Sequence, residues 1–461
     1  MAVQVSTDRL QTPGPRRTKP TGLVLHLLPP AVFIAKSESL KMKKLTLLAA
    51  ASALCLAAPL LTPALARAAS VSAAPHAATL QYAGVLTFSP DGVLFIGDNI
   101  GGAVFAYPMG EGAAPAAAPP LEVDGIDGRI AALLKAPRAS VHINGMAVHP
   151  TSHDVYLSVS YGAERPAVVK VSPVGVLSQV DLTRATNTNW VIPDAPTPDE
   201  HFRDRTGEWP VPAGDQYHVK AMTPMRSMTI VDMKFHNGEL FVAGISNEEF
   251  SSTLRRVSYP FDGQAASTAV QIYHVAHERY ETRAPIRAMG FATIDGQDTL
   301  IAAYTCSPLV LIPTADLKDG AKVTGKTIGD MGNGQPLSLV SVSFNGQPSL
   351  FVTNAGHGPR MIPVSGLQNA TGYLPDNSPH GGVGDWRPEY PLGPVGKELM
   401  FVGSSLFADK LDDKFLVSLT RDANSGSLNL EALPIFPLPM KLDQIWAEFD
   451  FKGGEPGAGA K

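Results

Sequence analysis

Short apolar runs separated by turn residues recur along the chain after residue 80. The clearest unit has an apolar stretch over Val85–Phe88, the turn Pro90-Asp91-Gly92 and a second apolar stretch over Val93–Asp98. A third stretch follows over Gly102–Tyr107. Proline sets φ in a turn and glycine accepts positive φ, so this pattern predicts a β-hairpin followed by a third strand.

Weaker copies of the same unit follow. Their first strands begin at Ile143, Ile230, Ile286, Leu337 and Leu399. Three of them have Asp-Gly or Asn-Gly turns, at Asn237-Gly238, Asp295-Gly296 and Asn345-Gly346. Most units begin roughly 50–60 residues apart, which is close to the period of propeller blades. The longer gap after the second unit contains residues 183–227, which we interpret as a loop insertion.

The repeats predict an all-β protein built as a β-propeller. A stacked β-sandwich is the alternative, but sandwich strands need not share the internal order of these units. Six copies favour six blades. A seventh blade remains open. It could lie in the insertion, or it could form where Leu80–Leu86 pairs with the C-terminal segment to close the ring. We expect a linker over 67–79, the propeller over 80–452 and a flexible tail over 453–461.

The N-terminal region predicts export. Met42-Lys43-Lys44 supplies a basic start, Leu45–Leu61 an apolar run, and Ala64-Leu65-Ala66 the small residues that a signal peptidase reads. Prolines interrupt the run, and it is shorter than the roughly 20 residues of a spanning helix. We therefore expect a signal peptide over 42–66, a non-native extension over 1–41, and a periplasmic or secreted protein without a transmembrane segment after cleavage.

Composition narrows the choice of partners. The net charge is −5, charged residues make up 17%, and no basic cluster follows the signal, so nucleic acid is not expected as a partner. Cleavage leaves Cys306 as the only cysteine. It lies in an apolar run, and we expect it to be buried as a small hydrophobe in a monomeric protein.

Two segments resemble the blade pattern of six-bladed propellers of the NHL and SMP-30/gluconolactonase kind: Phe88–Asp98 and Ile143–Pro150. SMP-30-like proteins are calcium-dependent hydrolases whose metal is held by a first-blade Glu, Asn residues at blade openings and an Asp. The resemblance implies Asn144 and Asp232 as metal ligands, with calcium as the cofactor. Ala83 stands where that Glu would be. NHL-type members mostly bind partners and need no such ligands.

Polar residues at the blade openings form the first set of candidate site residues. Asn144, Asp232, Arg287 and Ser338 are expected to face one another across a central channel. Asn and Asp oxygens suit Ca²⁺, whereas Arg287 suits a ligand carboxylate. Alternatively, Asp232 pairs with Arg287 and the set only hydrates the channel. A second set follows strand exits on the same face, where Asn and Asp also favour turns: Asn99, Asn247, Asn354 and His357.

Two functions remain from the sequence. The favoured one is an exported propeller that binds a small ligand or a protein partner across its central-channel face. The alternative is a metal-dependent hydrolase or lactonase of the SMP-30 type. Because Arg287 is expected beside the supposed metal, and the carboxylate at Ala83 is missing, the sequence favours binding and leaves enzymatic activity undecided.

Overall fold

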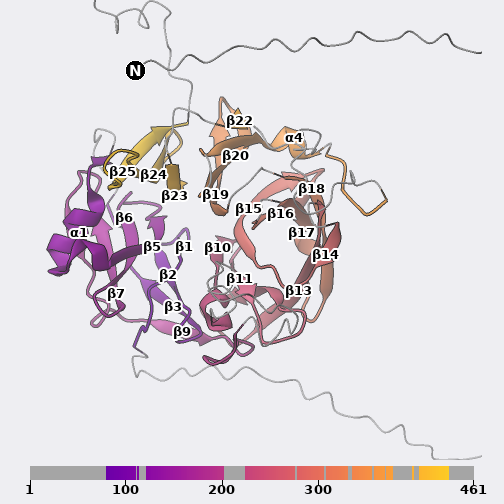
Figure 1. Ribbon diagram of the computed structural model, residues 1–461, viewed down its shortest axis with the longest axis horizontal. Helices are drawn as coiled ribbons and strands as arrows, with labels where there is room; N and C mark the ends of the chain where they lie inside the picture. Colours follow the sequence, from indigo (N-terminus) through magenta and orange to yellow (C-terminus); the bar gives the residue numbers. More distant parts are fainter. Residues whose placement is uncertain are drawn as a thin grey trace, which may run out of the picture. The chain divides into compact units, whose positions relative to one another are not determined.

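The prediction of an all-β propeller is confirmed by the computed structural model, in which β-sheets are arranged radially around a common centre (Figure 1). All described residues belong to one compact unit, Ala66–Lys461. The described residues are 79–110, 112–113, 121–201, 224–275, 278–305, 308–330, 335–355, 358–368, 370–376, 397–398 and 404–435. The predicted signal peptide, Cys306 and His357 lie outside them, so those predictions stay untested.

The described strands form six four-stranded units, each named here as a blade by its innermost strand. The β1 blade contains β1 (Leu86–Phe88), β2 (Val93–Asp98), β3 (Ala103–Pro108) and β9 (Thr188–Val191). The β5 blade contains β5 (Val141–Val148), β6 (Val155–Tyr161), β7 (Arg165–Val171) and β8 (Leu177–Gln179). The β10 blade contains β10 (Asp232–His236), β11 (Glu239–Ile245), β12 (Ser252–Ser258) and β13 (Ala265–His274), with β14 (Arg279–Glu281) beside β13.

The other three blades come from the C-terminal half. The β15 blade contains β15 (Ile286–Ile294), β16 (Gln297–Tyr304), β17 (Pro308–Pro313) and β18 (Lys322–Asp330). The β19 blade contains β19 (Pro336–Phe344), β20 (Gln347–Asn354), β21 (Arg360–Pro363) and β22 (Lys397–Glu398). The β23 blade contains β23 (Ser404–Lys410), β24 (Phe415–Arg421), β25 (Leu428–Pro434) and β4 (Glu122–Val123). Parallel pairing of β13 with β18 joins the β10 and β15 blades into one sheet.

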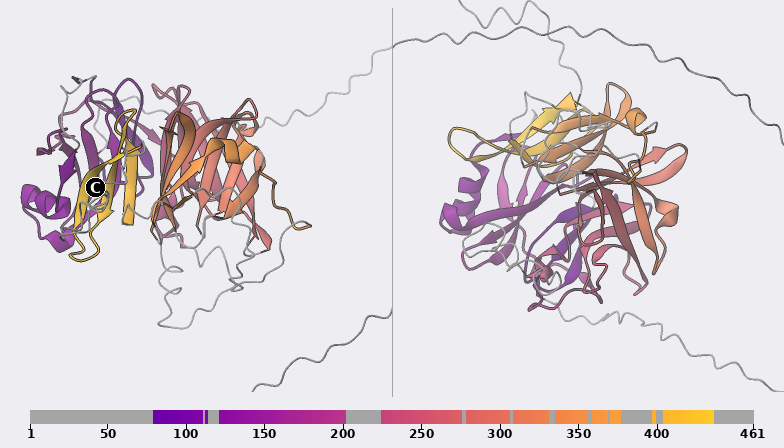
Figure 2. Two further views of the ribbon diagram at one scale, coloured as in Figure 1. Left: turned by 90° about the horizontal axis from the view of Figure 1, so that it is seen from above. Right: turned by 45° about the vertical axis from the view of Figure 1, so that its right-hand side comes forward.

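The blades do not follow chain order around the ring. Contacts between innermost strands give the circular order β5, β1, β10, β15, β19, β23 and back to β5. The first two blades of the sequence are therefore exchanged. In Figure 1 the indigo β1 blade lies between the purple β5 blade and the magenta β10 blade, and Figure 2 shows the stacked sheets from the side.

Two strands that cross between blades explain this exchange. After β3 the chain runs to the last blade, where Val123 on β4 pairs with Leu430 on β25. It then builds the β5 blade and returns to the first blade, where Trp190 on β9 pairs with Val104 on β3. The ring is thus closed by β4 rather than by Leu80–Leu86. The segment interpreted as a loop insertion, 183–227, contains β9.

The predicted hairpin turns form where glycine is placed to accept positive φ. Gly92 has φ of 80° in the first hairpin. In the Asn237-Gly238 turn both central residues have positive φ, 49° and 85°, which is the backbone of the two-residue turn that matches strand twist. In the final unit the expected first strand, Leu399–Val402, lies outside the described residues, and the innermost described strand is Ser404–Lys410.

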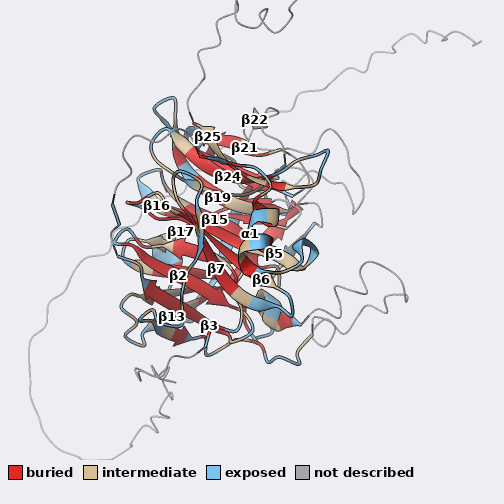
Figure 3. Ribbon diagram, turned by 90° about the vertical axis from the view of Figure 1, so that its left-hand side faces the viewer, coloured by how far each residue is buried: buried red, intermediate tan, exposed pale blue. Residues whose placement is uncertain are grey.

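Apolar packing between adjacent blades forms the core. The second strand of each blade is buried along most of its length, as the red strands of Figure 3 illustrate, and β2 is buried at every position. A strand that packs against a blade on each side buries both of its faces, which explains the near-continuous apolar runs in the sequence. Phe95, for example, packs with Val242 of the neighbouring blade in one fully buried cluster.

Helices are few and short in the described part of the chain. The α-helices are α1 (Ile126–Leu134) and α4 (Val364–Gln368), and 3-10 turns are η1 (Arg138–Ser140), η2 (Met225–Met228) and η4 (Thr314–Asp316). The sequence analysis missed α1, which buries Ile126, Ile130 and Leu134 beside β4 and the β5 blade. None of the described helices has the length and apolar character needed to cross a membrane.

Candidate functional site at the ring centre

A β-bulge recurs at the same place in four innermost strands. In β5 the register shifts between Ile143 and Gly145, and in β15 it shifts between Ile286 and Ala288. The extra residues are therefore Asn144 and Arg287, and β19 and β23 shift at the equivalent place. A bulge leaves one residue outside the ladder and re-aims its side chain, so each bulge presents one residue near the blade opening.

Asp232 lies one position beyond the bulge residues. It pairs with Ala243, and the N–H of the preceding Val231 also donates to the Ala243 carbonyl. Asp232 therefore corresponds to Ala288 and Ser338, which follow the bulge in their strands, and not to Arg287. The four predicted openings are thus two sets, offset by one residue: Asn144 with Arg287, and Asp232 with Ser338.

Both carboxylate oxygens of Asp232 accept backbone hydrogen bonds. Oδ1 accepts from Met233 N at 2.9 Å, and Oδ2 accepts from Met289 N of the next blade at 2.7 Å. Burial raises the pKa of this carboxyl, and the charges of Lys234 and Arg287, together with the two amides, partly oppose the rise. Asp232 therefore ties β10 to β15 and is the common neighbour of two cations.

Arg287 has an unused donor. Its Nε is buried and has no hydrogen-bond partner among the described residues. Burial lowers the pKa of the guanidinium and Asp232 opposes that change, so the two charges interact without forming a hydrogen-bonded pair. A buried donor without an acceptor is costly, which makes Arg287 the residue of this set most suited to receiving a ligand oxygen.

Two residues at the centre were missed by the sequence analysis. Lys234 lies two positions after Asp232 on β10, and its charge acts on both Asp232 and Asp409. Asp409 is on β23, which lies opposite β10 in the ring of six strands. Asp232, Lys234 and Asp409 are each only partly buried as whole residues. Lys234 falls inside a strand pattern of Asp-x-Lys, but sequence alone does not show which blade faces it.

Asp409 is held in the same manner as Asp232. Its Oδ2 accepts from Val148 N of the β5 blade at 2.8 Å, and its Oδ1 accepts from Lys410 N at 2.8 Å. Burial raises the pKa of the Asp409 carboxyl, opposed first by the charge of Lys234. The centre therefore holds two carboxylates whose oxygens face backbone amides, and two cations that lie near them.

Asn144 is engaged with the protein. Its amide nitrogen donates to the Ala83 carbonyl at 2.9 Å and to Ser160 Oγ at 2.8 Å. Ala83, the residue at the place of the expected glutamate, is fully buried. Asn144 therefore joins the β5 blade to the segment before β1.

The predicted rim residues divide by role. Asn99 exchanges two hydrogen bonds with Ile230, accepting at 2.8 Å and donating at 3.1 Å, and so joins the β1 blade to the start of β10. Asn247 is exposed, with its backbone N–H bonded to Asp194. Asn354 is buried opposite Pro336 at the start of β19.

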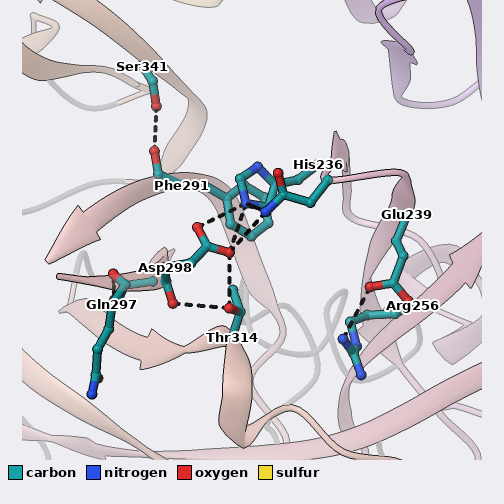
Figure 4. Close-up of polar contacts among 10 residues, drawn as sticks. His236, Glu239, Arg256, Phe291, Gln297, Asp298, Thr314 and Ser341 are labelled. Carbon is teal, nitrogen blue, oxygen red and sulfur yellow. Dashed lines mark hydrogen bonds and ion pairs between the residues drawn. The ribbon is translucent and has the colours of Figure 1, made fainter.

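A separate polar cluster lies at the other end of β10, with its residues shown in Figure 4. The carboxylate of Asp298 lies 3.0 Å from His236 Nε2 and accepts from Thr314 Oγ1 at 3.0 Å. The His236 ring stacks on Phe291 with centroids 3.9 Å apart. This cluster joins the β10 and β15 blades at the end of the ring away from Asp232.

The ring centre suits an anion better than a metal ion. Within the described ranges, no group of three or more His, Cys, Asp or Glu side chains is placed to hold a metal. A calcium ion at Asp232 would lie near Lys234 and Arg287, whose positive charges oppose it. An anion at the same place would be attracted by both cations and repelled by the Asp232 carboxylate unless that group took up a proton.

Comparison with known proteins finds matches among solved structures only. No protein-family model matches the chain, and no curated protein matches its sequence. A PQQ-bound aldose sugar dehydrogenase from Streptomyces coelicolor is 12% identical with a TM-score of 0.31, covering 80% of this chain and 96% of that one. A putative oxidoreductase (glucose dehydrogenase) from Thermus thermophilus is 13% identical with a TM-score of 0.29, covering 77% and 97%.

A third similar structure is the β-propeller domain of Cps50 (Swd1) from Myceliophthora thermophila. It is 11% identical with a TM-score of 0.28, covering 76% of this chain and 83% of that domain. The assignment of this chain to the propeller fold rests on its own strand pairing and on the ring of innermost strands.

Proposed function

We propose that this protein is an exported β-propeller of the NHL-like kind that binds a small ligand or a protein partner at the ring centre. The observation that carries the proposal is Arg287, whose buried Nε has no acceptor among the described residues although Asp232 is its electrostatic neighbour. Asp232 directs its oxygens to Met233 and Met289 instead. An acceptor supplied from outside, such as a ligand carboxylate, would satisfy the guanidinium.

The half-buried state of the central residues supports this choice. Asp232, Lys234 and Arg287 each keep part of their surface exposed, although the Nε of Arg287 is itself buried. Placing polar side chains on a rigid ring of strands holds them in position for recognition. The calcium-dependent hydrolase is the less suited candidate, because the positive charges of Lys234 and Arg287 act on Asp232 and oppose a cation there.

A thermal-shift screen of small carboxylates and peptides tests the proposal. A ligand that binds the folded state raises the melting temperature by an amount that grows with its concentration relative to its Kd. We expect stabilising ligands for the parent protein and none for Arg287→Met, with an unchanged melt in ligand-free buffer. Arg184→Met, at a side chain that is 90% exposed, is the matched control.

Two further measurements bear on the same proposal. Melts with CaCl₂ and with EDTA separate the alternatives, because a calcium site would make the melting temperature depend on the metal. N-terminal sequencing of the protein from the culture medium or periplasm tests export. We expect a first residue between Arg67 and Ser70, and finding Met1 or Met42 on exported protein would contradict that part.

A further inference from the structure

Lys234 is a second cation with unused donors at the ring centre. It forms no hydrogen bond or ion pair with the part of the chain that the structure describes, although its charge acts on Asp232 and Asp409. An ammonium group carries three N–H donors. Arg287 on the adjacent innermost strand also keeps an unused donor, at Nε. Lys234 is two positions from Asp232 on β10 and so shares its face of the strand, and Arg287 on β15 is two positions from Met289, whose N–H donates to Asp232 at 2.7 Å. Both cations are therefore neighbours of Asp232, and the charges of both act on it.

The carboxylates beside these cations already have hydrogen-bond partners. Asp232 and Asp409 each accept one backbone N–H from their own strand and one from the next blade. With all four groups ionised, the local charge sums to zero. A monoanion bound there would make the centre negative by one charge, unless one carboxylate took up a proton.

We propose that Lys234 and Arg287 together bind a small carboxylate inside the ring, and that Asp409 takes up one proton from solvent as the carboxylate binds. This inference rests on the proposed function, since it uses the same site and adds Lys234, the ligand class and the proton.

A carboxylate matches both donors. The planar guanidinium of Arg287 can bind its two oxygens side by side, and Lys234 can donate to a remaining lone pair. A tetrahedral anion such as phosphate offers the same charge with a different shape. The two anions are therefore separate arms of the test.

Asp409 is the carboxylate on which fewer cations act. Burial raises its pKa, and Lys234 is the only cation that opposes the rise among the described residues, whereas Asp232 has both Lys234 and Arg287. Once the ligand anion neutralises Lys234, that opposition weakens and the proton is favoured on Asp409. Proton binding and anion binding therefore assist each other, and affinity rises as the pH falls.

Few other charged groups share the innermost strands. On β5 the titratable residue is the exposed His142, and on β23 Lys410 is exposed and pairs with Asp413. His236 is at the far end of β10, where it pairs with Asp298. Strands β1 and β19 contain no charged residue. Asp409 is therefore the central group expected to respond.

Isothermal titration calorimetry of the full protein with sodium acetate tests the inference. Titrations at pH 5.5, 6.5 and 7.5, in two buffers with different ionisation enthalpies, report affinity and the number of protons taken up. We expect close to one proton per acetate and up to about a tenfold tighter Kd for each unit that the pH falls. Inorganic phosphate is expected to bind more weakly.

Variants separate the roles of the residues. Lys234→Met should weaken acetate binding at least tenfold, with the exposed Lys414→Met as control. Asp409→Asn should bind acetate with a Kd that no longer changes with pH. Asp409→Glu keeps a titratable group, so its Kd for acetate should still change with pH. This variant tests the role of the carboxyl if Asp409→Asn does not fold.

The outcomes distinguish this inference from the proposed function. Acetate binding without proton uptake, or binding unaffected by Lys234→Met, would overturn the inference while leaving an Arg287-dependent ligand site. Folded parent protein that binds neither acetate nor phosphate across this pH range would also overturn it. In that case the peptide and carboxylate screen with Arg287→Met still decides the proposed function.

Discussion

Asp232 on β10 accepts a hydrogen bond from the backbone N–H of Met289 on β15, at 2.7 Å, across the boundary between two blades. Ser338 makes the corresponding contact with Ala408 N at 3.3 Å, across the boundary between β19 and β23. Asp232 and Ser338 occupy equivalent positions in β10 and β19. Polar residues at the blade openings therefore join neighbouring innermost strands, and any ligand role must be measured apart from this structural one.

The first prediction concerns the dependence of stability on pH. Burial raises the pKa values of Asp232 and Asp409 in the folded protein above those in an unfolded chain. At a pH between the unfolded and the folded pKa values, the folded protein therefore binds more protons than the unfolded chain. The free energy of unfolding from these two groups therefore falls as the pH rises from about 4 through the raised values. We expect Asp409→Asn to reduce the loss between pH 5 and pH 7, measured by urea unfolding.

Asp422, which is only partly buried, is the control for this experiment. Hydrogen bonds from Ser425 lower the pKa of its carboxyl, so its contribution changes only at more acidic pH. Asp422→Asn should leave the difference between pH 5 and pH 7 as it is in the parent. An equal difference in parent and Asp409→Asn would contradict the prediction.

The second prediction separates a rim clamp from a ligand contact. Asn99 accepts from Ile230 N and donates to Ile230 O, so Asn99→Asp keeps the acceptor and loses the donor. We expect a loss of about 1–3 kcal/mol in the free energy of unfolding, because the Ile230 carbonyl is left without this donor. Asn247→Asp, at an exposed position, should change stability little. Reduced ligand affinity in a fully folded Asn99→Asp protein would instead assign Asn99 to the site.

The third prediction tests the strand that closes the ring. Val123 on β4 is 1% exposed and packs with Ile126 and Leu430 in one core cluster. Val123→Asp places a carboxylate in that core and so destabilises the packing that holds β4 against β25 of the last blade. We expect a loss of at least about 3 kcal/mol in denaturant unfolding. Glu122→Ala, on the exposed side of the same strand, should be close to neutral.

The fourth prediction concerns the cluster at the far end of β10. His236→Leu removes the contact with Asp298 and the stacking of the imidazole on Phe291. We expect a loss of about 1–3 kcal/mol in the free energy of unfolding, measured by urea titration. Carboxylate binding at the ring centre should be unchanged, because the cluster lies at the opposite end of the strand. The exposed Gln297→Ala serves as the control.

The strands and their turns could be predicted from sequence because their signals are local. Pro90-Asp91-Gly92 and Asn345-Gly346 combine glycine with residues that suit tight turns, and both hairpins form as predicted. The near-continuous apolar runs after the turns reflect burial on both faces of the second strand of each blade. The propeller followed from repetition of this unit, and Asp232 and Arg287 were found because they begin such units.

The tertiary structure decided the relations between blades. Pairing of β4 with β25 and of β9 with β3 joins segments about 300 and 85 residues apart, and pairs this short carry almost no local signal. Those two pairings set the circular order, and the order places Asp409 opposite Lys234. The bulges offset Asp232 from Arg287 by one residue, which no apolar pattern reveals. A central site is made of one or two residues from each blade, so its composition depends on ring order and register, which long-range pairing alone determines.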